Sequence, residues 1–234
     1  MLDVIQISYH EPYADDNFEL LQLFAPHAKQ IKGVKGIFEA HKAAAEIAET
    51  RNFYVIDADA VIDEQFNFKF TPGVNEEQWP GVMEVDCVFV WRSRNPVNDL
   101  LYGYGGAKLF PRKALREAKF WNIDMTTTLG CPFVPKFQIS NITAFNTDPF
   151  NTWKSAFREC TKLASAIIPN GGNTDNEYRL NVWQNKGAKR PMGEWAILGA
   201  KQGADFGQQY KDDEKTLNLI NDFDWLKETF DDAV

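Results

Sequence analysis

The chain has 234 residues, of which 44% are hydrophobic and 25% charged, enough apolar material for one large folded domain. The formal net charge of −8 argues against a protein that is basic throughout, and no apolar run approaches the ~20 residues of a membrane-spanning helix. Three cysteines without metal-knuckle spacing, and an N-terminus that enters a predicted strand without a signal peptide, predict a cytoplasmic location.

The first fifty residues predict a strand followed by two helices. Val4–Ser8 is a short apolar strand, and Asp16 or Asn17 caps the helix that follows it. A basic loop over residues 29–36 leads to a second, alanine-rich helix over Ile37–Glu49. With the strand that follows, this β-α-α-β order predicts an α/β fold with a mostly parallel sheet.

Two aspartates follow the next predicted strand. Phe53–Ile56 is a β-branched and aromatic run, typical of a buried parallel strand, and Asp57 and Asp59 come directly after it. Ligands of open α/β sheets bind beyond the carboxyl ends of strands, and two carboxylates there repel each other unless a cation joins them. Oxygen ligands of this kind suit Mg²⁺ or Mn²⁺. The alternative is a strand-to-loop turn with two solvated acids.

The second half of the chain predicts a further strand and several helices. Val85–Trp91 is a strand, and an aromatic, glycine-rich loop follows at Tyr102–Gly106. Thr152 can cap an amphipathic helix, another helix can run from Asp175 to Gly187, and the tail Asp213–Phe230 is amphipathic and predicted to pack back on the domain.

Gly36 to Asp59 resembles, in register, the nucleotide-binding core of GT-A glycosyltransferases. Gly36 precedes Ala40-His41-Lys42, an alanine-rich helix, an apolar strand and Asp57-Ala58-Asp59, at the spacing typical of that family. The sequence departs from the family in having His41-Lys42 where Arg-Asn is usual. Ser8-Tyr9-His10-Glu11 stands where the family has a turn that cradles the nucleotide base.

The resemblance implies a three-layer α/β/α sandwich with a mostly parallel sheet and C-terminal helices packed on it. It implies one domain over residues 1–234, with a nucleotide-sugar half (1–90), an acceptor half (91–200) and a helical tail (212–234). The implied donor is a nucleotide sugar, most simply a UDP-sugar, with Mn²⁺ or Mg²⁺ held by Asp57 and Asp59. The other residues implied to bind the nucleotide sugar are Ser8, Tyr9, Glu11, Lys35 and His41.

A second resemblance concerns the acceptor. Tyr102 to Phe110, together with Phe145-Asn146-Thr147-Asp148, is similar to phage enzymes that glycosylate hydroxymethylated cytosine in DNA. Residues 92–119 hold seven bases and two acids, whereas residues 212–234 hold eight acids and two lysines, so the charge is locally suited to a polyanion. DNA in a host cytoplasm is then the implied partner. The implied acceptor-binding residues are Tyr104, Gly105, Gly106, Arg112 and Lys113.

Transfer with inversion at the sugar needs a base for the acceptor hydroxyl. The candidates are Asp124 and Asp148, and the alternative for each of them is a simple turn or cap residue.

Two other functions remain open. Phe53–Val61 also fits the nucleophile strand of haloacid-dehalogenase-type phosphatases, with Asp57 phosphorylated and Asp59 as acid/base, although that strand usually opens its domain. The third possibility is a non-catalytic DNA-binding protein, in which the basic and aromatic middle of the chain binds backbone and stacks bases.

Overall fold

The computed structural model describes residues 1–73, 84–102, 105–119, 129–167 and 172–233, and these form two compact units. The first unit contains the described residues within 1–94, 101–121 and 128–144, and the second contains those within 95–100 and 145–234. The strands after residue 90 therefore belong to the same unit as the first strands. The expected packing of the C-terminal helices on the sheet stays a prediction.

The first unit is built from an eight-stranded mixed sheet. Its elements are β1 (Asp3–Ser8), α1 (Ala14–Phe24), β2 (Lys29–Lys32), α2 (Ile37–Ile47), β3 (Asn52–Asp57), β4 (Ala60–Ile62), the 3₁₀ turn η1 (Glu84–Asp86), β5 (Val88–Arg94), β6 (Leu101–Tyr102), β7 (Ala107–Pro111), α3 (Arg112–Glu117) and β8 (Phe133–Thr143). The strand order is β2-β1-β3-β7-β5-β8-β4, and β6 pairs with β5 off this path. Strands β2, β1 and β3 are parallel, as are β5 and β8, whereas β7, β4 and β6 are antiparallel to their neighbours. The predicted α/β class is confirmed.

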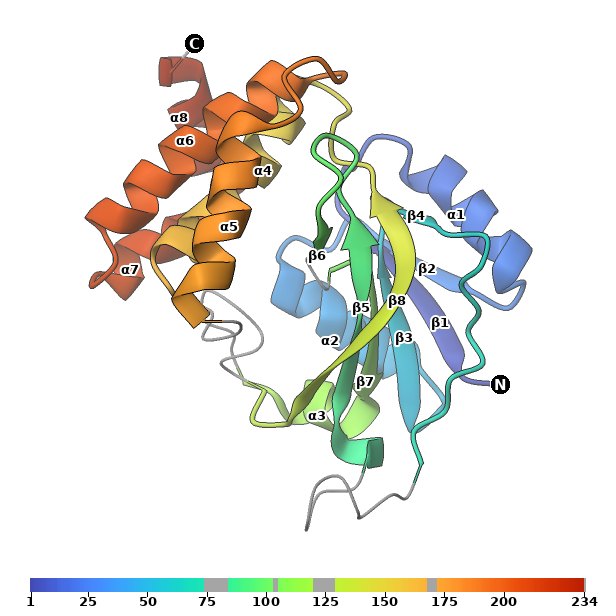
Figure 1. Ribbon diagram of the computed structural model, residues 1–234. Coiled ribbons are helices and arrows are strands. Elements are labelled where there is room, and N and C mark those ends of the chain that lie inside the picture. Colours follow the sequence, from blue (N-terminus) through green and yellow to red (C-terminus); the bar gives the residue numbers. More distant parts are fainter. Residues whose placement is uncertain (74–83, 103–104, 120–128, 168–171, 234) are drawn as a thin grey trace. The chain divides into compact units, whose positions relative to one another are not determined.

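Helices cover both faces of this sheet, so that the first unit has three layers (Figure 1). On one face, Leu21 of α1 lies in a buried cluster with Tyr54 and Ile56 of β3. On the other face, the His41 ring of α2 meets the ring of Phe110 edge-on at a centroid distance of 5.4 Å. The apolar side chains of β3 are buried on both faces of the sheet. Burial of each large apolar side chain stabilises the fold by about 1.5–3 kcal/mol.

Two N-terminal predictions are wrong in detail. Lys29–Lys32 is the edge strand β2, not a loop, and its residues are all half-exposed or exposed. A polar edge strand of this kind has no apolar face by which its sequence could reveal it. Helix α1 begins at Ala14, after Tyr13 in a left-handed conformation, and Asn17 is inside the helix, not at its cap. The element order is therefore β-α-β-α-β.

The second unit consists of helices. They are α4 (Pro149–Ala164), α5 (Gly172–Asn185), α6 (Gly193–Gln209), α7 (Glu214–Leu217), the 3₁₀ turn η3 (Asn218–Asn221) and α8 (Phe223–Ala233). The predicted amphipathic tail packs within this unit: Leu217, Ile220, Leu226 and Phe230 are buried in one cluster with Trp153 of α4. None of the helices in the described part of the chain is both long enough and apolar enough to cross a membrane.

Helices α4 and α6 approach each other through glycines. A Cβ atom added at Gly199 would lie 2.3 Å from the Trp153 carbonyl oxygen, and one at Gly203 would lie 2.2 Å from the Phe157 carbonyl oxygen. The two backbones are therefore in direct contact (Figure 1). The sequence did not predict α6, because glycines disfavour an isolated helix, and here the close packing compensates.

Helix α4 starts three residues before the predicted cap. Asp148 is its N-cap and accepts a hydrogen bond from the Asn151 backbone N–H at 2.8 Å, while Pro149 occupies the first turn. The Thr152 hydroxyl lies inside the helix and donates to the Asp148 carbonyl at 2.6 Å. The next predicted helix also begins earlier, at Gly172 instead of Asp175.

Candidate functional site

Polar residues gather at one edge of the sheet in the first unit. Because β1, β2, β3, β5 and β8 run in the same direction, their carboxyl ends share this edge, and the antiparallel strand β7 begins there. The edge therefore brings together Ser8, Lys32, Asp57, Gly106 and Thr143. The carboxyl edge of an α/β sheet is where ligands bind in this class of fold.

The segment Asp57-Ala58-Asp59 is held at each of its three residues. The Asp57 N–H donates to the Gly106 carbonyl at 3.1 Å, and the Asp59 carbonyl accepts from the Ala144 N–H at 2.7 Å. Between them, the buried Asn17 side chain of α1 donates to the Ala58 carbonyl at 2.8 Å. Three segments that are far apart in the sequence thus fix the turn that carries both aspartates.

The Asp57 carboxylate pairs with a lysine that the sequence analysis did not single out as a site residue. Lys108 lies on β7 opposite Val55 of β3, so that its side chain shares a face of the sheet with Asp57 two residues further on. The Lys108 Nζ is 2.8 Å from both Asp57 carboxylate oxygens. Lys108 is only 3% exposed, and a buried ammonium requires a partner of this kind.

Asp59 is partly buried among like charges. Burial, together with the charges of Asp57 and Glu11, raises the pKa of Asp59 to about 7, and the charge of Lys108 opposes this only in part. Near neutral pH this carboxyl group therefore takes up either a proton or another cation readily. No group of three His, Cys, Asp or Glu side chains suited to a metal occurs in the part of the chain that the structure describes.

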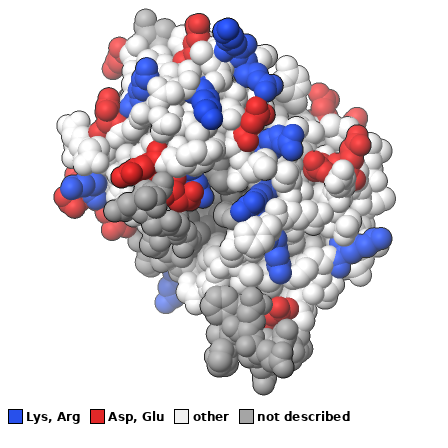
Figure 2. Space-filling view, in the orientation of Figure 1, with Lys and Arg blue, Asp and Glu red and all other residues white. Residues whose placement is uncertain are grey.

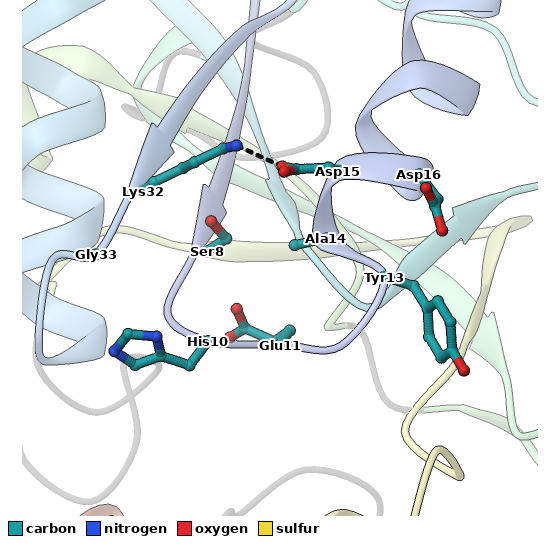
Figure 3. A pocket seen from close by; sticks show the side chains of 9 residues that line it. All are labelled: Ser8, His10, Glu11, Tyr13, Ala14, Asp15, Asp16, Lys32 and Gly33. Carbon is teal, nitrogen blue, oxygen red and sulfur yellow. Dashed lines mark ion pairs between the residues drawn. The ribbon is translucent and has the colours of Figure 1, made fainter.

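A hollow of about 480 Å³ opens at the same edge, beside the ends of β1 and β2. The residues lining it are Ser8, His10, Glu11, Tyr13, Ala14, Asp15, Asp16, Lys32 and Gly33. Figure 3 shows the ion pair between Lys32 and Asp15, whose Nζ and Oδ1 atoms are 2.5 Å apart, and the Glu11 carboxylate turned back toward the strand ends. The lining is rich in carboxylates, which accept hydrogen bonds from hydroxyl and N–H groups.

The loop below the hollow is shaped by unusual backbone angles. His10 and Tyr13 have φ values of 62° and 63°, a left-handed region that non-glycine residues seldom adopt. Glu11, between them, accepts a hydrogen bond from the Tyr9 N–H at 2.5 Å. Strain of this sort is kept only where the surroundings impose it, and it is common at ligand sites.

Five of the residues predicted to bind the nucleotide sugar or its metal lie together at this edge. Ser8 and Glu11 line the hollow, and Asp59 lies within electrostatic reach of Glu11 and Asp57. Tyr9 lies in the same loop as Glu11. Lys35 is exposed in the turn between β2 and α2 and does not line the hollow.

His41 is placed where a phosphate could not reach it. The ring is 0% exposed, and its Nδ1 is 2.7 Å from the Ile37 carbonyl oxygen, so Nδ1 carries the proton. Burial, together with the charge of Lys108, lowers the pKa of His41 to about 3, and the bond to Ile37 opposes this only in part. His41 is a neutral packing residue between α2 and the sheet.

This gives a pH dependence with a defined sign. Between pH 6.5 and 3 the unfolded chain protonates His41 and the folded chain does not, so stability is lost as pH falls. We expect the free energy of unfolding of the wild type, relative to His41→Asn, to fall by about 1.4 kcal/mol per pH unit between pH 6 and 4. Urea denaturation at several pH values measures this difference, and because Asp59 titrates in both proteins its opposite effect cancels. If the free energy of unfolding changed with pH in the same way for the wild type and His41→Asn, the assignment of His41 as a buried, neutral residue would be contradicted.

The glycine and basic residues predicted to bind the acceptor have structural partners. A Cβ added at Gly106 would lie 2.2 Å from the side chain of Asn141, so Asn141 takes the space that a side chain at residue 106 would need. Arg112 Nε donates to the Ala45 carbonyl at 3.0 Å, and Lys113 pairs with Glu117 at 3.9 Å. Gly105 lies just before β7 and is half-buried. Tyr104 lies outside the described residues.

The basic stretch at residues 92–119 does not form one charged surface. Lys108 is buried, Arg92 stacks over the Phe137 ring at 4.7 Å, and Arg116 pairs with Glu46 at 3.1 Å. On the face drawn in Figure 2, Lys and Arg side chains are interspersed with Asp and Glu.

Only one of the two candidate bases, Asp148, lies among the described residues. Asp148 belongs to the second unit, where burial raises its pKa but hydrogen bonds from Asn151 and Thr147 and the charge of Lys154 outweigh this, leaving the pKa below its usual value. That makes Asp148 a helix cap and a weak base. Asp124 lies outside the described residues.

No model of a known protein family matches the chain, and no curated protein matches it. The site must therefore be interpreted from its own chemistry.

Proposed function

We propose that this protein is a glycosyltransferase that binds a nucleotide sugar and a divalent cation at the Asp57-Asp59 edge and transfers the sugar to an acceptor hydroxyl. The observation that carries the proposal is the Asp59 carboxyl group, partly buried beside two further carboxylates at the carboxyl edge of the sheet. A divalent cation bound here would relieve the repulsion among these carboxylates, and the phosphate oxygens of a nucleotide diphosphate would supply the remaining metal ligands.

The residues present fit such a metal. Mg²⁺ and Mn²⁺ are commonly held by one or two carboxylates, with substrate phosphate oxygens and water completing the coordination. Asp59, with Asp57 beside it, offers that donor set, and a third protein ligand is not required. When bound, the metal would neutralise charge on the departing diphosphate.

The hollow beside β1 and β2 suits the nucleoside part of the donor. Its carboxylates, from Glu11, Asp15 and Asp16, favour ribose hydroxyls and base N–H groups and repel phosphates. Lys32 pairs with Asp15 and can donate to a base carbonyl from the same wall. Glu11 lines this hollow and is close enough to Asp59 for its charge to act on that carboxyl group, so a nucleoside in the hollow would have its diphosphate within reach of the aspartates.

Phosphoryl transfer through Asp57 is a second candidate, favoured by one observation. Asp59 lies two residues from Asp57 and its pKa of about 7 suits a general acid/base. Against it, both carboxylate oxygens of Asp57 accept hydrogen bonds from Lys108, which lowers the nucleophilicity of the carboxylate. Hydrolysis of an aryl phosphate with Mg²⁺, lost in Asp57→Asn, would favour this candidate.

A melting-temperature screen tests the glycosyltransferase proposal. We expect one nucleoside diphosphate or nucleotide sugar, with UDP and UDP-sugars first, to raise the melting temperature by about 5 °C or more at 100 times its dissociation constant. The rise should require Mn²⁺ or Mg²⁺, since the diphosphate completes the metal site. If the melting temperature were the same with every nucleotide, with and without the metal, the proposal would be wrong.

A further inference from the structure

Among the described residues, Lys108 is the only Lys or Arg that is buried. It sits in the interior of the sheet, because β7 pairs with β3 through Val55 and with β5 through Val90. An ammonium group this far from water is tolerated only with a close counter-charge. The Asp57 carboxylate supplies it, with both oxygens 2.8 Å from Nζ.

The geometry fixes the carboxylate as well as the lysine. A single Nζ at equal distances from both oxygens holds the carboxylate plane in one orientation, and Lys108 itself is held by two neighbouring strands. Asp57 is 28% exposed at its side chain, so it is the outer member of the pair and Lys108, at 4%, the inner one. The pair as a whole adds no net charge to the edge of the sheet.

Asp59 differs from Asp57 in this respect. It follows the turn, and no Lys or Arg among the described residues forms an ion pair with its carboxylate. The negative charge available at this edge therefore belongs to Asp59, with Glu11 further out along the hollow.

We propose that Lys108 is a positioning residue that neutralises and orients Asp57, so that Asp59 alone of the two aspartates binds the divalent cation. This inference rests on the proposed function, because it divides the roles within the same site. Asp57 then serves as a fixed acceptor beside the metal, and the Asp57–Lys108 pair can be replaced by a neutral pair without loss of the metal.

Single and double variants that remove the charges of Lys108 and Asp57 distinguish a metal bound by Asp59 alone from a metal bound by both aspartates. The variants are Lys108→Met, Asp57→Asn and the double variant, and Asp59→Asn is the reference for loss of the metal. Methionine matches the length of lysine, and asparagine has the shape of aspartate, so the double variant removes both charges and keeps the volume. Free Mn²⁺ is measured by electron paramagnetic resonance during titration, with and without UDP.

The expected result is that the double variant binds Mn²⁺ within about threefold of the wild type, because the net charge of the site is unchanged. Lys108→Met alone should bind Mn²⁺ about tenfold more tightly, since it leaves a second free carboxylate, and Asp57→Asn about tenfold more weakly. A merely structural lysine would not produce a gain. If Lys108→Met or Asp57→Asn fails to fold, the Mn²⁺ affinities of the double variant and the wild type still test the inference.

The outcomes are distinct. Loss of Mn²⁺ in the double variant to the level of Asp59→Asn would overturn the inference, because Asp57 would then be a ligand itself. Absence of Mn²⁺ binding by the wild type, with UDP present, would overturn the proposed function and the inference together. Mn²⁺ binding by the wild type with loss in the double variant leaves the proposed function standing alone.

Discussion

Asp59→Asn should lose Mn²⁺-dependent nucleotide binding by at least about 100-fold, because it removes the carboxylate whose charge is least compensated at the site. The same substitution should raise the melting temperature at pH 8, where the wild type holds a partly buried charge that burial and its neighbours disfavour. Loss of binding together with a gain in stability is the pattern of a residue kept for function. Calorimetry with Mn²⁺ and UDP, and thermal denaturation, measure the two effects.

The control is Glu64→Gln, which removes an exposed carboxyl group from the same segment of the chain. It should change neither binding nor melting temperature appreciably. Asp59→Asn with wild-type affinity for UDP and Mn²⁺ would contradict the assignment of the metal to this residue. A variant that binds less tightly and also melts lower would show that Asp59 mainly supports the fold.

Gly203→Ala should destabilise the second unit by about 3 kcal/mol, through the clash of a new Cβ with the backbone of α4. The added atom would lie 2.2 Å from the Phe157 carbonyl oxygen and 2.7 Å from the Phe157 Cα, and backbone cannot rotate aside as a side chain can. In an isolated helix the same change would stabilise, by about 1 kcal/mol, because alanine is the better helix former. The sign of the effect therefore reports on helix packing.

Gln208→Ala provides the matched control, since it places an alanine at an exposed position of the same helix. Its free energy of unfolding, from urea denaturation followed by circular dichroism, should stay within about 0.5 kcal/mol of the wild type. If Gly203→Ala is as stable as Gln208→Ala, the two helix backbones are not in contact.

The sequence identified the strand β3 and its two aspartates because the signal is local. An apolar run over Phe53–Ile56 and the Asp57-Ala58-Asp59 that follows it lie within a few residues of one another. The predicted helix α2 was likewise confirmed, over Ile37–Ile47, because its alanine-rich pattern is contained in one segment. Patterns that a single element creates by itself can be recognised before any tertiary contact is known.

Lys108 was missed for the opposite reason. It is separated from Asp57 by 51 residues, and only the antiparallel pairing of β7 with β3 brings the two together. A lysine inside the apolar segment Ala107–Pro111 was the available signal, because a charge among buried residues requires a partner. The sequence could indicate that a partner exists, but not which carboxylate it is.

His41 illustrates a different limit. Its position in a motif-like segment predicted a contact with phosphate, yet the phase of α2 turns the ring toward Phe110 and away from water. Which face of a helix meets the sheet depends on the packing of neighbouring elements. The glycines of α6 show the same dependence, because only their contacts with α4 explain why so glycine-rich a segment is helical.

The most direct test of the central claim is analysis of the products formed from a sugar-labelled UDP-sugar with Mn²⁺. The wild type and Asp59→Asn should be incubated with hydroxymethylcytosine DNA, unmodified DNA, protein and lipid as acceptors, and the products separated by mass spectrometry. The proposal predicts UDP and label on one hydroxyl acceptor with the wild type, and neither with Asp59→Asn. Label on hydroxymethylcytosine DNA alone would also support the predicted DNA acceptor. Release of inorganic phosphate, or no turnover of any nucleotide sugar that the protein binds, would contradict the account.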